Sequence, residues 1–217
     1  MFDPAVIVPY LPTLIEGAGI TFAVSILAIL LGIPCGLALC FLRQSRGRGS
    51  ATAAAVYISF FRGTPLLVQL LVFFYIPPAY GIELPAYLTA VAVLTMNTTA
   101  FQAEIFRGGL QAIPRGQVEA ARMLGFTHGQ VRRRVLVPQM LRVTLPALTN
   151  EAIDILKSSS LVSVIAVSEL LRRGRQVAAA TYHPLEAYAA TALMYLLLVS
   201  LIAYAGRRAG RRLSLSR

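Results

Sequence analysis

Four long apolar runs dominate the chain. Residues 17–42, 84–103 and 187–206 contain no Asp, Glu, Lys or Arg, and residues 51–82 contain only Arg62. A transmembrane helix needs about 20 mostly apolar residues. Each of the four runs is therefore long enough to cross a bilayer.

A fifth apolar run, residues 143–167, differs because it carries Glu151, Asp154 and Lys157. Backbone polar groups in lipid must be satisfied within the segment, so regular helix is expected in every run. Proline can kink or break a helix locally, as expected here at positions 34, 65 and 146. The pattern predicts an all-α membrane protein with a single transmembrane domain over residues 1–217. Its five transmembrane helices are expected at 17–42, 52–77, 84–106, 143–168 and 186–206.

Composition supports a membrane protein. Hydrophobic residues make up 57% of the 217 positions and charged residues only 13%, and the mean hydropathy is +0.68. A soluble domain carries about 25% charged residues, and a disordered chain is poor in apolar residues, so both classes are excluded. The net charge of +11 is compatible with nucleic acid or membrane. The apolar runs favour the membrane, and no nucleic-acid partner is expected.

The distribution of basic residues predicts the orientation. Fifteen follow the first, third and fifth spans, against three between the fourth and fifth. The fifteen are Arg43, Arg46, Arg48, Arg107, Arg115, Arg122, Arg132, Arg133, Arg134, Arg142, Arg207, Arg208, Arg211, Arg212 and Arg217. The three are Arg172, Arg173 and Arg175. Because Lys and Arg concentrate on the cytoplasmic side, the N-terminus is expected outside and the C-terminus in the cytoplasm.

The loop at 107–140 contains two short predicted helices. From Pro114 it reads PRGQVEAARMLGFTHGQVRRRVLVPQ. Proline suits a first helical turn, Gly125 is a natural stop, and Thr127 with Gln130 forms a capping-box pattern. Pro138 is expected to end the second helix. The loop is either a compact hairpin projecting from the membrane or a pair of amphipathic helices lying on lipid headgroups.

Four stretches of the chain, taken together in their sequence order, resemble one protein family. EAARMLG at 119–125 resembles the EAA loop of bacterial ABC importer permeases. FRGTPLLVQ at 61–69, EIFRGGLQAIPRGQ at 104–117 and LKSSSLVSVIAVSEL at 156–170 are similar to the polar amino acid uptake branch of that family. The chain departs from many relatives at Ser158, where they have Asp.

The resemblance implies a type I ABC importer permease fold in the bacterial cytoplasmic membrane, as a multi-pass protein. The EAA loop then docks on a separate ATPase dimer, which binds ATP and Mg. The chain itself is expected to hold no cofactor. The implied ATPase contacts are Glu119, Ala120, Ala121, Arg122, Leu124 and Gly125. Further implied partners are a second permease subunit (identical or different), an extracellular or periplasmic amino-acid-binding protein, the amino acid and membrane lipid.

The sequence shows no pattern typical of an ATP-binding site or a metal site. A phosphate-binding loop ends in Gly-Lys-Ser/Thr, whereas the only lysine, Lys157, follows Leu156. The two histidines, His128 and His183, are expected on opposite sides of the membrane, so no shared metal site is predicted. The chain is predicted not to be an enzyme.

Ionisable residues inside spans are costly and mark a pathway or an ion pair. Glu104 and Arg107 are spaced for a pair, as are Asp154 and Lys157. Arg62 precedes Gly63-Thr64-Pro65, where the helix is expected to break, and is interpreted either as structural or as facing a substrate carboxylate.

Glu151 and Asp154 share one helix face, and Asn97 is a polar residue in the third span. If these faces meet, they form a polar chamber in which carboxylates attract the ammonium group of an amino acid. We expect a polar amino acid as substrate and, more narrowly, a basic one such as arginine, histidine or lysine. The alternative is that the acids only satisfy Lys157 and a partner subunit. The expected substrate-binding residues are Thr64, Leu66, Asn97, Phe101, Glu151 and Asp154.

Three functions compete. The leading one is the transmembrane subunit of an ATP-driven amino acid importer that works by alternating access. An ion- or proton-coupled carrier acting without ATP would also use intramembrane acids, but such carriers commonly have duplicated halves. A membrane scaffold would need only the basic loop, and the buried acids argue against it.

Overall fold

The computed structural model describes residues 3–45 and 47–214, so Arg46 and Arg217 of the orientation argument lie outside the described residues. Within the described residues the protein is all-helical, with no strand. The elements are η1 (Pro4–Tyr10), α1 (Leu11–Arg43), α2 (Arg48–Gly63), α3 (Leu66–Ala79), α4 (Ala86–Gln111), α5 (Arg115–Met123), α6 (His128–Gln130), η2 (Val131–Leu136), α7 (Val137–Ser158), η3 (Ser159–Ile165), α8 (Leu170–Thr181) and α9 (Pro184–Ser214).

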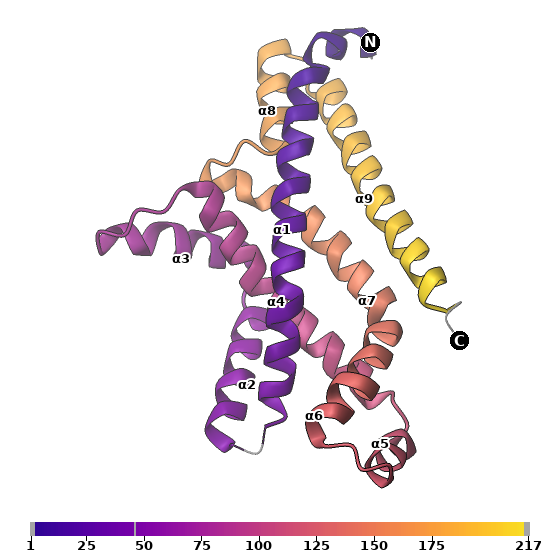
Figure 1. The fold of residues 1–217 in the computed structure, drawn as a ribbon. Helices are drawn as coiled ribbons and strands as arrows, with labels where there is room; N and C mark the ends of the chain where they lie inside the picture. Colours follow the sequence, from indigo (N-terminus) through magenta and orange to yellow (C-terminus); the bar gives the residue numbers. More distant parts are fainter. Residues whose placement is uncertain (1–2, 46, 215–217) are drawn as a thin grey trace.

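Helix α1 extends along the whole bundle, from the end that holds α8 and the N-terminus to the end that holds α5 and α6 (Figure 1). It packs most extensively on α4. A Cβ atom at Gly32 would lie 2.7 Å from Thr98 Cγ2, and one at Gly36 would lie 3.0 Å from Gln102 Cβ. Glycine at these two positions therefore permits the close approach that brings α1 against the polar side chains of α4.

Two single helices, α1 and α9, are long and apolar enough to cross a membrane, among the residues described. Helices α2 and α3 together make a third such segment, although they meet at an angle of 107°. The break falls at Pro65, as the sequence predicts. Pro34 and Pro146, in contrast, lie inside α1 and α7 without ending them.

The main apolar core lies where α1, α3, α4, α7 and η3 meet, around the fully buried Leu94 and Leu156. Helix α9 lies at the edge of the bundle (Figure 1), and only 6% of its apolar window is buried within the chain. Leu193, Leu196 and Leu197 are each more than 60% exposed. Lipid or another subunit must cover such a surface.

Helix α8 is anchored to the bundle by Glu169, which caps its N-terminus. The buried Glu169 carboxylate accepts hydrogen bonds from the backbone N–H groups of Leu171, at 2.8 Å, and Arg172, at 2.7 Å. It also accepts one from the hydroxyl of Tyr195 on α9, at 2.8 Å. Three helices are thus tied together at this end, since the Leu170 N–H donates to the Thr21 hydroxyl of α1.

Candidate functional site

The break between α2 and α3 is held by side-chain amides. Proline at 65 has no N–H to donate, so carbonyl groups of the preceding turn lose their usual helical partners. The Gln69 amide donates to Phe61 O at 2.9 Å and to Thr64 Oγ1 at 2.8 Å. Asn97 of α4 donates to Gln69 Oε1 at 3.0 Å and to Phe61 O at 3.3 Å. Two amides therefore fix the shape of the broken helix.

A second cluster of polar side chains surrounds Glu151 on α7. Thr98 of α4 donates its hydroxyl to Glu151 Oε1 at 2.9 Å, and Gln102 donates to Thr98 Oγ1 at 3.2 Å. The Gln102 Oε1 atom is buried without a hydrogen-bond partner among the described residues. Glu151 forms no salt bridge with any described residue. This half-buried carboxylate therefore has no direct ion pair in the described chain, although the Arg62 guanidinium acts on it electrostatically at longer range.

Asp154 differs from Glu151 although the two share a helix. Its side chain is 65% exposed and pairs with Lys157 at 2.7 Å. The alternative that the acids satisfy Lys157 and a partner subunit therefore agrees with the contacts of Asp154, and for Glu151 it requires the partner subunit.

Glu104 is the centre of a cluster of arginines. The predicted pair with Arg107 is present, with 2.9 Å between Arg107 Nη2 and Glu104 Oε2. Arg43 of α1 also forms a salt bridge with Glu104, and Arg62 of α2 approaches it at 3.9 Å. The Arg62 guanidinium lies over the Phe101 ring, 5.3 Å from its centroid. One carboxylate thus joins three helices and leaves a local excess of positive charge.

The predicted substrate residues fall into two groups that contact α4 through the adjacent residues Asn97 and Thr98. Thr64, Leu66 and Asn97 lie at the α2–α3 break, whereas Glu151 contacts α4 through Thr98. Phe101 lies beneath Arg62. Two buried amides have roles that were not predicted from the sequence. Gln69 and Gln102, at 2% and 1% exposure, could have been noticed as amides within apolar helices.

The loop at 107–140 folds as a helical hairpin. We use "hairpin" for residues 115–136, which comprise α5, α6 and η2. Gly125 has φ +81° at the turn, a conformation that favours glycine. Both hydrogen bonds of the predicted Thr127–Gln130 capping box are present.

The expectation that Pro138 ends the second helix is wrong. Helical structure continues from His128 through the π-helical segment Val131–Leu136 into α7, where Pro138 occupies the first turn. A π-helical turn shifts the hydrogen-bond register, and proline is tolerated in a first α-turn because its missing N–H has no helical acceptor there.

The predicted ATPase contacts occupy different surroundings in the hairpin. Ala121 is buried at 6%, whereas Leu124 is 77% exposed. Its neighbour Met123, which is not among the predicted contacts, is 89% exposed. Ala120 and Gly125 are also exposed. The predicted contacts therefore do not form one uniformly exposed surface.

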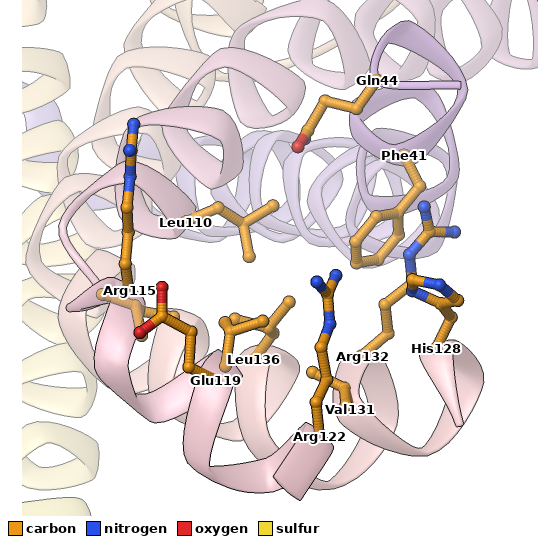
Figure 2. A pocket seen from close by; sticks show the side chains of 12 residues that line it. Phe41, Gln44, Leu110, Arg115, Glu119, Arg122, His128, Val131, Arg132 and Leu136 are labelled. Atoms are coloured by element: carbon orange, nitrogen blue, oxygen red, sulfur yellow. The ribbon is translucent and has the colours of Figure 1, made fainter. Parts of the chain in front are cut away.

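Glu119 and Arg122 line a pocket of about 420 Å³ between the hairpin and the end of α1. Figure 2 shows the Arg122 and Arg132 side chains extending from the hairpin toward Phe41 and Gln44. Arg132 lies 5.0 Å from the centroid of the Phe41 ring. The hairpin is thereby connected to the end of the long helix α1.

Residues 3–45 and 47–214 contain no cluster of three or more His, Cys, Asp or Glu side chains that could bind a metal ion. His128 lines the pocket at the hairpin. His183 contacts Glu186 at 3.4 Å, at the start of α9.

Comparison with known proteins gives consistent matches. The family described as "binding-protein-dependent transport system inner membrane component" matches residues 28–215. The arginine transport system permease protein ArtQ of Bacillus subtilis (strain 168) is 35% identical over 97% of each chain. The glutamine transport system permease protein GlnP of Escherichia coli (strain K12) is 36% identical over 99% of each chain.

A solved structure has the same fold throughout. It is a crystal structure of an amino acid ABC transporter with histidines, 37% identical in sequence, with a TM-score of 0.90 over 98% of this chain and 99% of that one. An inward-facing structure of the MetNI methionine ABC transporter, at 24% identity, has a TM-score of 0.81 over 95% of this chain and 98% of that one. The fold is that of type I ABC importer permeases.

Proposed function

Because this chain belongs to the family of binding-protein-dependent transport system inner membrane components and is a permease subunit of an amino acid ABC importer, we propose that it carries a basic amino acid, using Glu151 as the main anionic contact. The ATPase of such importers is a separate protein, so the chain is a transport component and not an enzyme. Nothing favours a carrier that acts without ATP.

The half-buried Glu151 is the observation that carries the substrate proposal. Thr98 supplies its hydrogen bond, and no described cation forms a salt bridge with it, Arg62 acting on it only at longer range. A carboxylate in a low-dielectric setting attracts a cationic ligand more strongly than one in water. A substrate ammonium or guanidinium group can supply the direct ion pair that Glu151 lacks. The relatives named for arginine and glutamine, and the structure solved with histidines, support a polar amino acid.

Other predicted substrate residues would complete the site around this contact. Asp154 is exposed beside the pathway and would act there together with Lys157, with which it forms a salt bridge at 2.7 Å. Asn97, Thr64 and Leu66 would shape the opposite wall at the α2–α3 break, and Phe101 would supply an aromatic face.

The membrane arrangement proposed for this function has five spans. These are α1, the broken α2–α3 pair, α4, α7 with η3, and α9. The excess of basic residues after the first, third and fifth spans supports an external N-terminus and a cytoplasmic C-terminus. In this orientation the hairpin faces the cytoplasm and α8 faces outward, in the cytoplasmic membrane of a bacterium.

Alternating access would then link three partners. An ATPase dimer would bind the exposed tip of the hairpin, including Leu124. A second permease subunit, identical or different, would complete the pathway. A binding protein would deliver the amino acid near α8, where Arg172 and Arg175 can add charged contacts. ATP binding would bring the two hairpins together and bias the spans toward the outward-open state.

Reconstitution of the permease with its ATPase and binding protein tests the substrate assignment. ATP hydrolysis is measured with arginine, lysine, histidine and glutamine in turn. We expect a basic amino acid to stimulate most strongly, and Glu151→Gln to reduce that stimulation by at least about 10-fold, which corresponds to about 1.4 kcal/mol. The exposed Glu83→Gln, the same chemical change in the α3–α4 loop, serves as the matched control.

Two further results decide between the parts of the proposal. Unchanged selectivity in Glu151→Gln would contradict the role of the carboxylate while leaving the transporter intact. Glu119→Arg is expected to abolish stimulated hydrolysis by weakening ATPase association. Normal association and coupling in that variant would remove Glu119 from the contact surface.

A further inference from the structure

The pocket between the hairpin and α1 combines an apolar wall with a basic rim. Its apolar wall includes Leu110 and Leu136, and its basic rim includes Arg115, Arg122 and Arg132. Apolar and cationic side chains placed together in this way match a molecule that has both an anionic and an apolar part.

Positive charge in the pocket is not balanced within the described chain. Arg115, Arg122 and Arg132 form no salt bridge with any described residue. Glu119 is the one carboxylate among the lining residues, which also include His128. The pocket therefore has a surplus of at least two positive charges, and an anion would neutralise it.

The location of the pocket indicates which kind of anion it binds. The apolar run of α1 ends at Leu42, next to the lining residues Phe41 and Gln44. A polar site at the end of a membrane-spanning helix lies at the depth of lipid headgroups. The Arg122 and Arg132 side chains extend toward this end of α1 rather than away from it (Figure 2).

We propose that this pocket binds the headgroup of an anionic phospholipid from the surrounding leaflet. The phosphate contacts the guanidinium groups of Arg122 and Arg132, and the start of an acyl chain covers the apolar wall. Basic pockets on the cytoplasmic side of membrane proteins bind anionic headgroups in this manner. The bound lipid connects the hairpin to α1 and makes the position of the hairpin sensitive to membrane composition.

Fluorescence quenching can measure this binding directly, because the chain contains no tryptophan. Phe41→Trp introduces a single fluorophore in the pocket wall and retains an aromatic ring beneath Arg132. The full chain is reconstituted alone in vesicles of phosphatidylcholine and phosphatidylglycerol at equal mole fractions. One lipid at a time is brominated near its headgroup, and the two quenching efficiencies give a relative binding constant.

We expect phosphatidylglycerol to bind roughly fivefold more strongly than phosphatidylcholine, the ratio expected from about one net cationic contact. Adding Arg122→Gln and Arg132→Gln should lower the ratio to about one. Arg48→Gln with Arg133→Gln removes the same charge from exposed positions outside the pocket lining. This control should keep the preference.

Several outcomes would overturn the proposal. Equal quenching by both lipids in the Phe41→Trp chain would exclude selective binding without recourse to any arginine variant. Equal loss of preference in both double variants would indicate general surface charge. Removal of the preference by millimolar inorganic phosphate would assign the pocket to a free anion, and removal by the ATPase would assign it to that partner. The measurement needs no amino acid, so its result is independent of the substrate proposal.

Discussion

The polar network inside the bundle and the hairpin at its end differ in how their polar groups are satisfied. Inside the bundle, Gln69 and Asn97 are buried, and each is hydrogen-bonded within the chain. In the hairpin, Arg115 and Arg122 are exposed and form no salt bridge with described residues.

The difference reflects the cost of burial. A buried polar group without a partner costs about 1 to 3 kcal/mol, which the fold avoids for the amides of Gln69 and Asn97. Gln102 Oε1 is the exception, because it is buried without a partner among the described residues. Exposed arginines are solvated and can remain available to another molecule. Glu151 combines features of both regions, because it is half-buried and yet forms no salt bridge with a described residue. A missing salt bridge is therefore a better guide to external partners than polarity alone.

The largest expected loss of stability follows from a substitution in the bundle, at Gly109. A Cβ atom there would lie 2.2 Å from Thr144 Cγ2, and Thr144 is buried with its hydroxyl bonded to Met140 O at 2.8 Å. We expect Gly109→Ala to lower the free energy of unfolding by about 2 to 3 kcal/mol through overpacking. Thermal unfolding in detergent measures the loss. Gly108→Ala, with no atom nearby, is the control and should not destabilise.

The next largest loss of stability is expected in the polar network around Glu151. Thr98→Val preserves the side-chain shape but removes the hydroxyl that Glu151 and Gln102 share, which should cost about 2 kcal/mol. Thr95→Val on the same helix is the matched control. The Thr95 hydroxyl is buried without a partner, so its removal should be neutral or stabilising. Equal destabilisation by both variants in unfolding experiments would show that the network contributes nothing specific.

Glu104 links the bundle to its charged end, and a smaller effect is expected there. Glu104→Gln removes the carboxylate that Arg43 and Arg107 share and should cost about 1 kcal/mol, because solvent screens these partly exposed charges. Arg107→Gln should cost less, since two arginines remain near Glu104. Unfolding measured at low and high salt tests this. A loss that does not shrink as salt increases would contradict an electrostatic cause.

The smallest loss of stability, a local one, is expected in the hairpin. Thr127→Ala removes an N-cap whose hydroxyl accepts a hydrogen bond from the Gln130 N–H, a change that costs about 1 kcal/mol locally. Hydrogen exchange should increase at amides of the hairpin and remain unchanged in α4 and α9. Thr127→Ser, which keeps the hydroxyl, should restore protection. Faster exchange throughout the bundle would show that the hairpin is not an independent unit.

Local patterns were sufficient for many features. The helix break at Pro65, the turn at Gly125, the capping box at Thr127 and the Glu104–Arg107 pair all follow from residues close together in the sequence. Such features depend on backbone preferences and on i,i+3 spacing. Pro138 shows the limit of the same reasoning, because a local rule does not reveal that a π-helical turn precedes it.

The sequence by itself determined the membrane class, the helical architecture and the family motifs, because apolar run length and local turn chemistry do not depend on distant contacts. Only the tertiary structure decided which polar groups meet. It directs Asn97 to the α2–α3 break and Glu151 to Thr98, and it leaves Asp154 paired with Lys157 at the surface. Helix periodicity identifies a shared face, whereas the close approach of separate helices determines which residues on that face are buried and which keep an unbalanced charge.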